Sequence, residues 1–151
     1  MAYGWNLENQ SALPVFVECQ ARGIEINIAG ALYFGGYGHL FDTRNAPLEV
    51  QTRMARWQTL AEQFGGYRYE PRQSCFCLSR IDLSEGDGGC SLHELAVALA
   101  ALPAGAKVVL GMRNESEVES NMAAVEKAHT VPRELWLEAQ RRGLLSAELP
   151  L

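Results

Sequence analysis

Apolar side chains recur every three to four residues in two stretches of the chain, which predicts two amphipathic helices. The first covers residues 48–64 and is followed by a glycine pair that ends it. The second covers residues 91–102. Its first residue, Ser91, stands three positions before Glu94, the spacing of a capping box at a helix start.

Three further helices are predicted from weaker periodicity and from end signals, over residues 8–22, 114–127 and 130–145. Each has a short polar side chain near its start that favours an N-cap. These expected caps are Ser11, Asn114 and Thr130. The apolar side chains expected to face inward are Leu48, Met54, Trp57, Leu60, Ala61 and Phe64 in 48–64, and Leu135, Trp136, Ala139 and Leu144 in 130–145.

Two short apolar runs rich in β-branched residues, 24–29 and 107–110, predict β-strands. A helix precedes each run and a glycine-containing loop follows it, an order typical of α/β proteins with parallel strands. Parallel strands are normally covered on both faces, so we expect 107–110 to be buried. Because two strands make neither a closed barrel nor a stable sheet, the pattern also predicts missing partners.

Composition narrows the class of protein. Apolar residues make up 48% of the 151 residues and charged ones 21%, as in ordinary globular chains. The net charge of −5 argues against nucleic acid or an anionic membrane as the main partner. No apolar run is long enough for a transmembrane helix, and the first residues do not resemble a secretory signal. We therefore expect a cytoplasmic protein whose four cysteines are reduced.

Residues 66–90 combine aromatic, arginine, serine, glycine and cysteine residues without a sustained period, so we interpret them as a loop insertion. Cys75, Cys77, Cys90 and His93 together suggest a tetrahedral zinc site. The Cys-x-Cys spacing is tighter than usual, however, and His93 stands inside a helix start. We favour free thiols and expect no metal.

The sharpest chemical signal is the corner 108–114, where a strand leads through Gly111 into a helix N-terminus. Glycine admits a ligand close to the backbone, and the helix N-terminus favours an anion. Arg113 can bind a phosphate or stack on a base. Asn121 follows Asn114 by seven residues, so both lie on one helix face, and its amide suits an adenine edge. The competing interpretation is an ordinary strand–helix junction with a solvated arginine.

Three segments carry a resemblance to one family. Residues 108–125 (VVLGMRNESEVESNMAAV) resemble the last strand and following helix of aldo-keto reductases, with their Gly-x-Arg-x(7)-Asn pattern. Residues 131–145 are similar to the terminal helix of the branch that contains D-threo-aldose, L-galactose and pyridoxal dehydrogenases. Residues 13–36 resemble that branch's helix, penultimate strand and glycine-rich turn. The likeness spans most of 7–66 and 91–145.

The resemblance implies that residues 1–151 are the C-terminal portion of an α/β TIM barrel, with two to three parallel strands and four to five helices. It implies an oxidoreductase acting on a sugar, aldehyde or alcohol, with NAD or NADP as cofactor. By position in the family's pattern, the cofactor-binding residues would be Ala31, Leu32, Tyr33, Gly111, Met112, Arg113, Asn114, Glu117 and Asn121.

Within that set, the resemblance implies that Gly111, Arg113 and Asn121 contact the adenosine end of the cofactor, with Arg113 at the ribose 2′-position. Ala31, Leu32 and Tyr33 would follow the pyrophosphate or nicotinamide side. Two departures from the family bear on the cofactor. Many relatives have Gln in place of Glu117, whose carboxylate repels a 2′-phosphate and favours NAD. Many also stack an aromatic ring where this chain has Gly30, which cannot stack.

The family's catalytic Asp, Tyr, Lys and His lie on earlier strands, so no catalytic residue is assigned here. We expect a fragment that binds the nicotinamide cofactor and associates with itself or with the missing N-terminal half. The alternative is a non-catalytic nucleotide-binding or protein-interaction module derived from the barrel.

Overall fold

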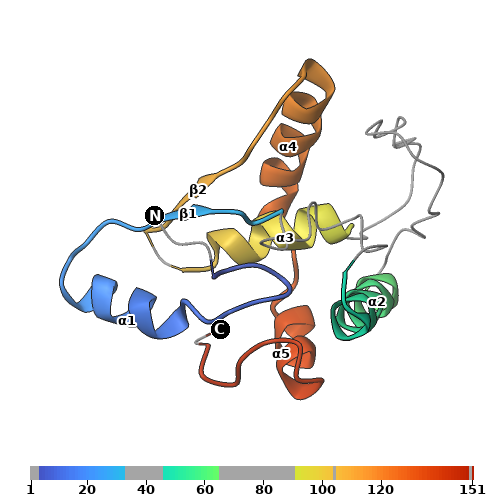
Figure 1. Ribbon diagram of the computed structural model, residues 1–151, viewed down its shortest axis with the longest axis horizontal. Helices are drawn as coiled ribbons and strands as arrows, with labels where there is room; N and C mark the ends of the chain where they lie inside the picture. Colours follow the sequence, from blue (N-terminus) through green and yellow to red (C-terminus); the bar gives the residue numbers. More distant parts are fainter. Residues whose placement is uncertain (1–3, 33–45, 65–90, 104, 150) are drawn as a thin grey trace.

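A computed structural model describes residues 4–32, 46–64, 91–103, 105–149 and 151. Tyr33 and the predicted insertion 66–90 lie outside these residues. The described elements, in chain order, are α1 (Leu13–Ala21), β1 (Asn27–Ala29), α2 (Leu48–Gln63), α3 (Leu92–Ala101), β2 (Lys107–Val109), α4 (Glu115–Ala128) and α5 (Arg133–Arg141). Helix α3 crosses the middle of the molecule, with α4 rising against it and the strand pair on one side (Figure 1).

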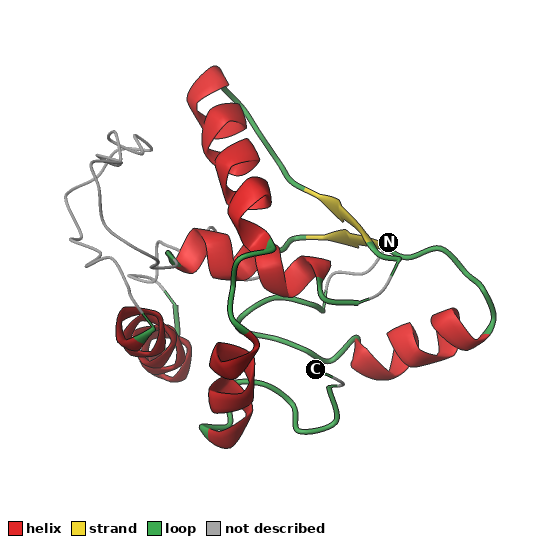
Figure 2. Ribbon diagram, turned by 180° about the vertical axis from the view of Figure 1, so that it is seen from behind, coloured by secondary structure: helices red, strands yellow, loops and turns green. Residues whose placement is uncertain are grey.

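The two strands lie side by side and parallel, as Figure 2 shows. Ile28 stands opposite Val108, and the Lys107 amide donates to the Ile26 carbonyl oxygen at 2.9 Å. The carboxyl ends of both strands therefore meet at one edge. Ile28 is fully buried, but the side chain of Val109 is 45% exposed. The prediction of a buried strand at 107–110 is wrong, because among the described elements only β1 and α3 pack closely on β2.

Helix α3 is the centre of the apolar core. Its capping box forms as predicted: the Glu94 amide donates to Ser91 Oγ at 3.2 Å, and the Ser91 amide donates to the Glu94 carboxylate at 2.7 Å. Every residue from Glu94 to Ala100 is buried. The helix packs against α4, α2 and β2, so it joins the strand pair to the helices.

Two predicted caps are wrong. Helix α1 starts after Ala12 without a side-chain cap, so Ser11 lies one residue before the N-cap position, where its backbone N–H donates to Asn9 Oδ1 at 2.8 Å. Helix α5 starts after Pro132. The Thr130 hydroxyl instead donates back to the Lys127 carbonyl oxygen at 2.8 Å and so terminates α4. Asn114 does cap α4 as predicted.

The buried faces of α2 and α5 match the predicted apolar stripes in most positions. In α2 the buried side chains are Val50, Met54, Trp57, Leu60 and Ala61. Leu48, also expected in the stripe, is 77% exposed. In α5 and the turn after it, Leu135, Trp136, Ala139 and Leu144 are buried as predicted.

The segment before α1 is anchored in the core by indole hydrogen bonds. Trp5 and Leu7 are fully buried. The Trp5 Nε1–H donates to the Leu99 carbonyl oxygen at 2.8 Å, and the Trp57 Nε1–H donates to the Leu7 carbonyl oxygen at 2.9 Å. Buried indole groups of this kind need such partners. The segment therefore joins α3 to α2.

Arg53 of α2 adds a second anchor. Its Nε–H donates to the Leu7 carbonyl oxygen at 3.2 Å, beside the bond from Trp57. Its terminal nitrogens donate to the carbonyl oxygens of Gly143, at 3.4 Å, and of Leu144. One guanidinium thus connects the first described segment to the turn after α5.

Replacing Trp57 with Phe should destabilise the fold. The change removes the N–H bound to Leu7 and leaves space in the core, so the free energy of unfolding should fall by about 1–3 kcal/mol. Thr59→Ala, at an exposed position of the same helix, should change it by less than about 0.5 kcal/mol. Urea unfolding measures both, and equal effects would show that the indole does not anchor the segment.

Candidate functional site

The corner after β2 is held by the start of α4. The chain leaves β2 through Gly111 and Met112 and enters the helix after Asn114. Asn114 Oδ1 accepts the Glu117 amide at 2.9 Å, which satisfies one of the otherwise unpaired N–H groups of the first turn. This hydrogen bond sets the direction in which the chain enters α4.

Glu117 places a carboxylate at this helix N-terminus. Its Oε2 accepts the backbone N–H of Arg113 at 2.7 Å, and its Oε1 accepts the Arg113 guanidinium at 3.0 Å. The Asn114 side-chain amide donates to the same carboxylate at 3.3 Å. The Glu117 side chain is only 16% exposed, whereas that of Arg113 is 56% exposed. The positive end of the helix dipole is therefore balanced by the protein's own anion.

Asn121 lies one turn further along α4 and is 3% exposed. Its Nδ2 donates to the Gly111 carbonyl oxygen at 3.4 Å, and its Oδ1 lies 2.8 Å from His93 Nε2. The amide is thus bound on both sides within the protein. It contacts the corner from the interior.

His93 of α3 completes this buried group. Its Nδ1 lies 3.3 Å from the Ser120 hydroxyl. Because Asn121 presents its oxygen to Nε2, this nitrogen carries the proton, and Nδ1 accepts from Ser120 in the neutral ring. Burial lowers the pKa of His93 below its ordinary value, opposed by the hydrogen bond to Asn121 and the charge of Glu94.

The chain leaves β1 at the same edge as the corner. Gly30 has a φ of 79°, a conformation that glycine adopts without strain. Its carbonyl oxygen accepts from Asn6 Nδ2 at 3.3 Å. Ala31 and Leu32, two predicted cofactor residues, are buried, with 1% and 4% of their surface exposed. The parallel pairing brings 30–32 and the corner to one edge, and the predicted Tyr33 lies outside the described residues.

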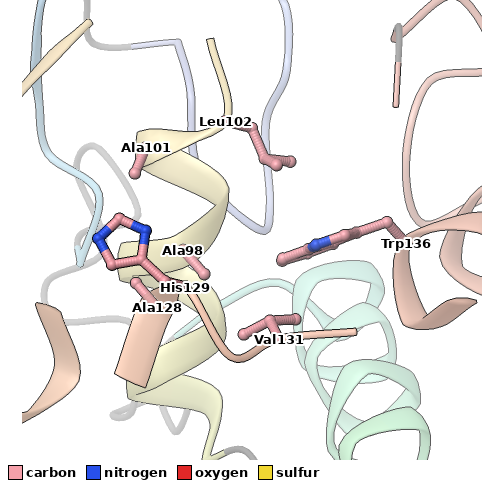
Figure 3. Close-up of a pocket in the computed structure, with 7 residues that line it drawn as sticks. All are labelled: Ala98, Ala101, Leu102, Ala128, His129, Val131 and Trp136. Carbon is pink, nitrogen blue, oxygen red and sulfur yellow. The ribbon is translucent and has the colours of Figure 1, made fainter. Parts of the chain in front are cut away.

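Two surface hollows lie away from this edge. Figure 3 shows one of about 240 Å³, between α3, the end of α4 and Trp136. His129 is the single titratable side chain that lines it, and alanine side chains form much of the wall. A second hollow of about 610 Å³ lies along α2 and includes Arg53 and Arg56. None of the predicted cofactor residues that the structure describes lines either hollow.

Sequence reasoning missed the role of His93 in this network. The sequence suggests His93 as a zinc ligand beside three cysteines, which lie outside the described residues. Nothing near it in sequence indicates a bond to Asn121, because the two side chains meet only where α3 packs on α4. The described part of the chain holds no cluster of three or more His, Cys, Asp or Glu side chains that suits a metal ion.

No helix in the described ranges is long and apolar enough to cross a membrane. Comparisons of the chain with protein-family models, with curated proteins and with solved structures gave no match. The resemblance to aldo-keto reductases therefore stays a prediction that depends on the quoted residues.

The partly buried His93 should make stability depend on pH. Its pKa is below 6.5 in the folded protein, so the unfolded chain takes up a proton first as the pH falls. The stability gained from neutral His93 is thus complete above about pH 6.5 and is lost below it. Urea unfolding of the wild type and His93→Gln from about pH 5 to pH 7.5 measures this. A wild-type slope equal to that of the variant would contradict it.

Proposed function

We propose that this chain is the C-terminal portion of an NAD(P)-dependent oxidoreductase of the aldo-keto reductase type. It would supply the adenosine-binding corner of a partial TIM barrel and none of the catalytic residues. The observation that carries the proposal is the parallel pair β1–β2, which ends beside a helix N-terminus where Arg113 and Glu117 are bound together. In open and closed parallel sheets, ligands bind at this carboxyl edge.

The groups at the corner suit an adenosine ribose. Gly111 presents no side chain, and Arg113 is more than half exposed. The Glu117 carboxylate already accepts hydrogen bonds from Arg113 and Asn114, and its Oε2 can accept one more, from a ribose hydroxyl of NAD. A 2′-phosphate would approach this carboxylate and compete with it for Arg113. The arrangement therefore favours NAD over NADP.

The remaining predicted contacts would come from the loop after β1. Ala31 and Leu32 would direct the chain along the pyrophosphate or nicotinamide side, and Asn121 would support the corner from within. The bound nicotinamide would supply the hydride for a sugar, aldehyde or alcohol. Such an enzyme would work in the cytoplasm. Since no catalytic residue is assigned to this chain, it should not oxidise an aldose by itself.

The alternative is a protein-interaction module, and exposed apolar side chains favour it. Val118, Met122 and Val125 of α4 are 42%, 53% and 38% exposed and lie on one helix face, at intervals of four and three residues. Val15 and Val17 of α1 are also more than half exposed. Such surfaces favour association with another copy of the chain or with a missing half-barrel.

Exchanging one glutamate should change the cofactor preference. In a titration followed by NADH or NADPH fluorescence, the wild type should bind NADH more tightly. Glu117→Gln removes the charge that pairs with Arg113, so the affinity of this variant for NADPH should rise about tenfold, or ~1.4 kcal/mol. Glu119→Gln removes the same charge from an exposed position of α4 and should have no such effect.

The outcomes of this titration separate the explanations. Failure of the wild type to bind either nucleotide would reject the nucleotide-binding proposal. Equal shifts in the two variants would mean that net charge, and not the bond between Glu117 and Arg113, sets the preference.

The interaction alternative makes a separate prediction about self-association. Met122→Lys places a charge in the exposed stripe of α4, so it should shift the sedimentation profile toward smaller species. Glu119→Lys, outside the stripe, is the matched control. A wild-type chain that sediments as a single monomer and unfolds cooperatively would contradict association through this surface.

A further inference from the structure

The place where α3 crosses α4 contains a continuous series of polar contacts that runs from the edge of the apolar core to the exposed corner. The series runs from the Ser120 hydroxyl to His93, from His93 to the Asn121 amide, and from that amide to the carbonyl oxygen of Gly111. Asn121 is almost fully buried, and His93 is partly buried. A buried polar series of this kind is stable only when each member has a partner.

From this geometry we infer that His93 is a positioning residue for the corner at Gly111, acting through the side-chain amide of Asn121. The inference rests on the proposed function in so far as the corner binds NAD. The orientation of the corner itself is independent of any ligand.

A histidine suits this position because one neighbour, Asn121, needs a hydrogen-bond donor and the other, Ser120, can use an acceptor. Asn121 presents an oxygen, which needs a donor, and Ser120 presents a hydroxyl that can donate. The neutral imidazole with its proton on Nε2 supplies one donor and one acceptor. It thereby selects the orientation of the Asn121 amide. With Oδ1 bound to His93, Nδ2 points to the Gly111 carbonyl.

The orientation of the Asn121 amide affects the backbone of the corner because the residue that it binds, Gly111, is a glycine. The peptide planes beside a glycine rotate more freely than those beside other residues, so a bond to the Gly111 carbonyl oxygen selects one of several orientations. In a trans peptide the C=O and the following N–H point in opposite directions. Holding the Gly111 carbonyl toward the interior therefore turns the Met112 N–H outward. Met112 is 45% exposed, so solvent reaches this residue. The inferred role of the Met112 amide is to meet a nucleotide at the corner.

The test compares three variants of the full chain, labelled with ¹⁵N, by amide NMR and by titration with NADH. His93→Leu removes both the donor and the acceptor. We expect it to shift the amide resonances of Gly111 and Met112 and to weaken NADH binding about tenfold. His93→Gln can donate to Asn121 and accept from Ser120, so it should keep the wild-type resonances and bind within about threefold of the wild type.

Leu92→Ala is the matched control for a general loss of stability. Leu92 neighbours His93 on α3 and packs against the core, but it is not part of the polar series. It should lower the melting temperature without the shifts at Gly111 and Met112. If His93→Leu does not fold, Asn121→Asp replaces it, because aspartate still accepts from His93 but cannot donate to Gly111.

The two readouts separate this inference from the proposed function. Unchanged Gly111 and Met112 resonances in His93→Leu, or the same shifts in Leu92→Ala, would overturn the positioning role whatever the binding result. Shifted resonances with NADH binding equal to the wild type would overturn the role in nucleotide binding. If the wild type does not bind NADH but the shifts are specific to His93→Leu, the proposed function fails and the positioning of the corner stands.

Discussion

The fold depends on the burial of one backbone carbonyl, that of Leu7. This residue is fully buried in a segment without regular secondary structure, so its carbonyl oxygen cannot be satisfied by a helix or sheet. Trp57 and Arg53, one turn apart on α2, both donate to it. The same arginine reaches the turn after α5. The Trp57 bond is made in the interior, and the Arg53 bonds extend it toward the surface, so together they fix the segment, α2 and the turn after α5 relative to one another.

The candidate site uses the same principle with different results at two successive turns of α4. At the first turn, Glu117 satisfies the helix N-terminus and holds Arg113 where solvent reaches it. One turn further along, Asn121 joins the corner to His93 and is nearly inaccessible. A ligand at the corner would meet Glu117 and Arg113 directly, whereas Asn121 would act on it through Gly111. The first turn of α4 would therefore contact the ligand, and Asn121, one turn later, would hold the corner in place.

The strand pair explains why the exposed apolar surface of α4 and the exposed face of β2 occur together. A helix that follows a parallel strand normally covers the sheet next to that strand. Here Val109 of β2 and Met122 of α4 are both about half exposed, at 45% and 53%. Further strands and helices beside β2 would bury both. This is the physical reason for considering the chain together with a partner or a second half.

Local signals along the chain determined much of the secondary structure. The capping box of Ser91 and Glu94 and the cap at Asn114 act over a single helical turn, and the apolar periods of α2 and α5 each lie within one helix. The sequence alone therefore predicts them. The caps expected at Ser11 and Thr130 are wrong because α1 begins after Ala12 and α5 begins after Pro132, while the Thr130 hydroxyl donates to the end of α4. Only the tertiary structure decided that Val109 is exposed and that His93 meets Asn121. Both depend on which elements pack together, and residues 28 positions apart leave no local pattern of their contact.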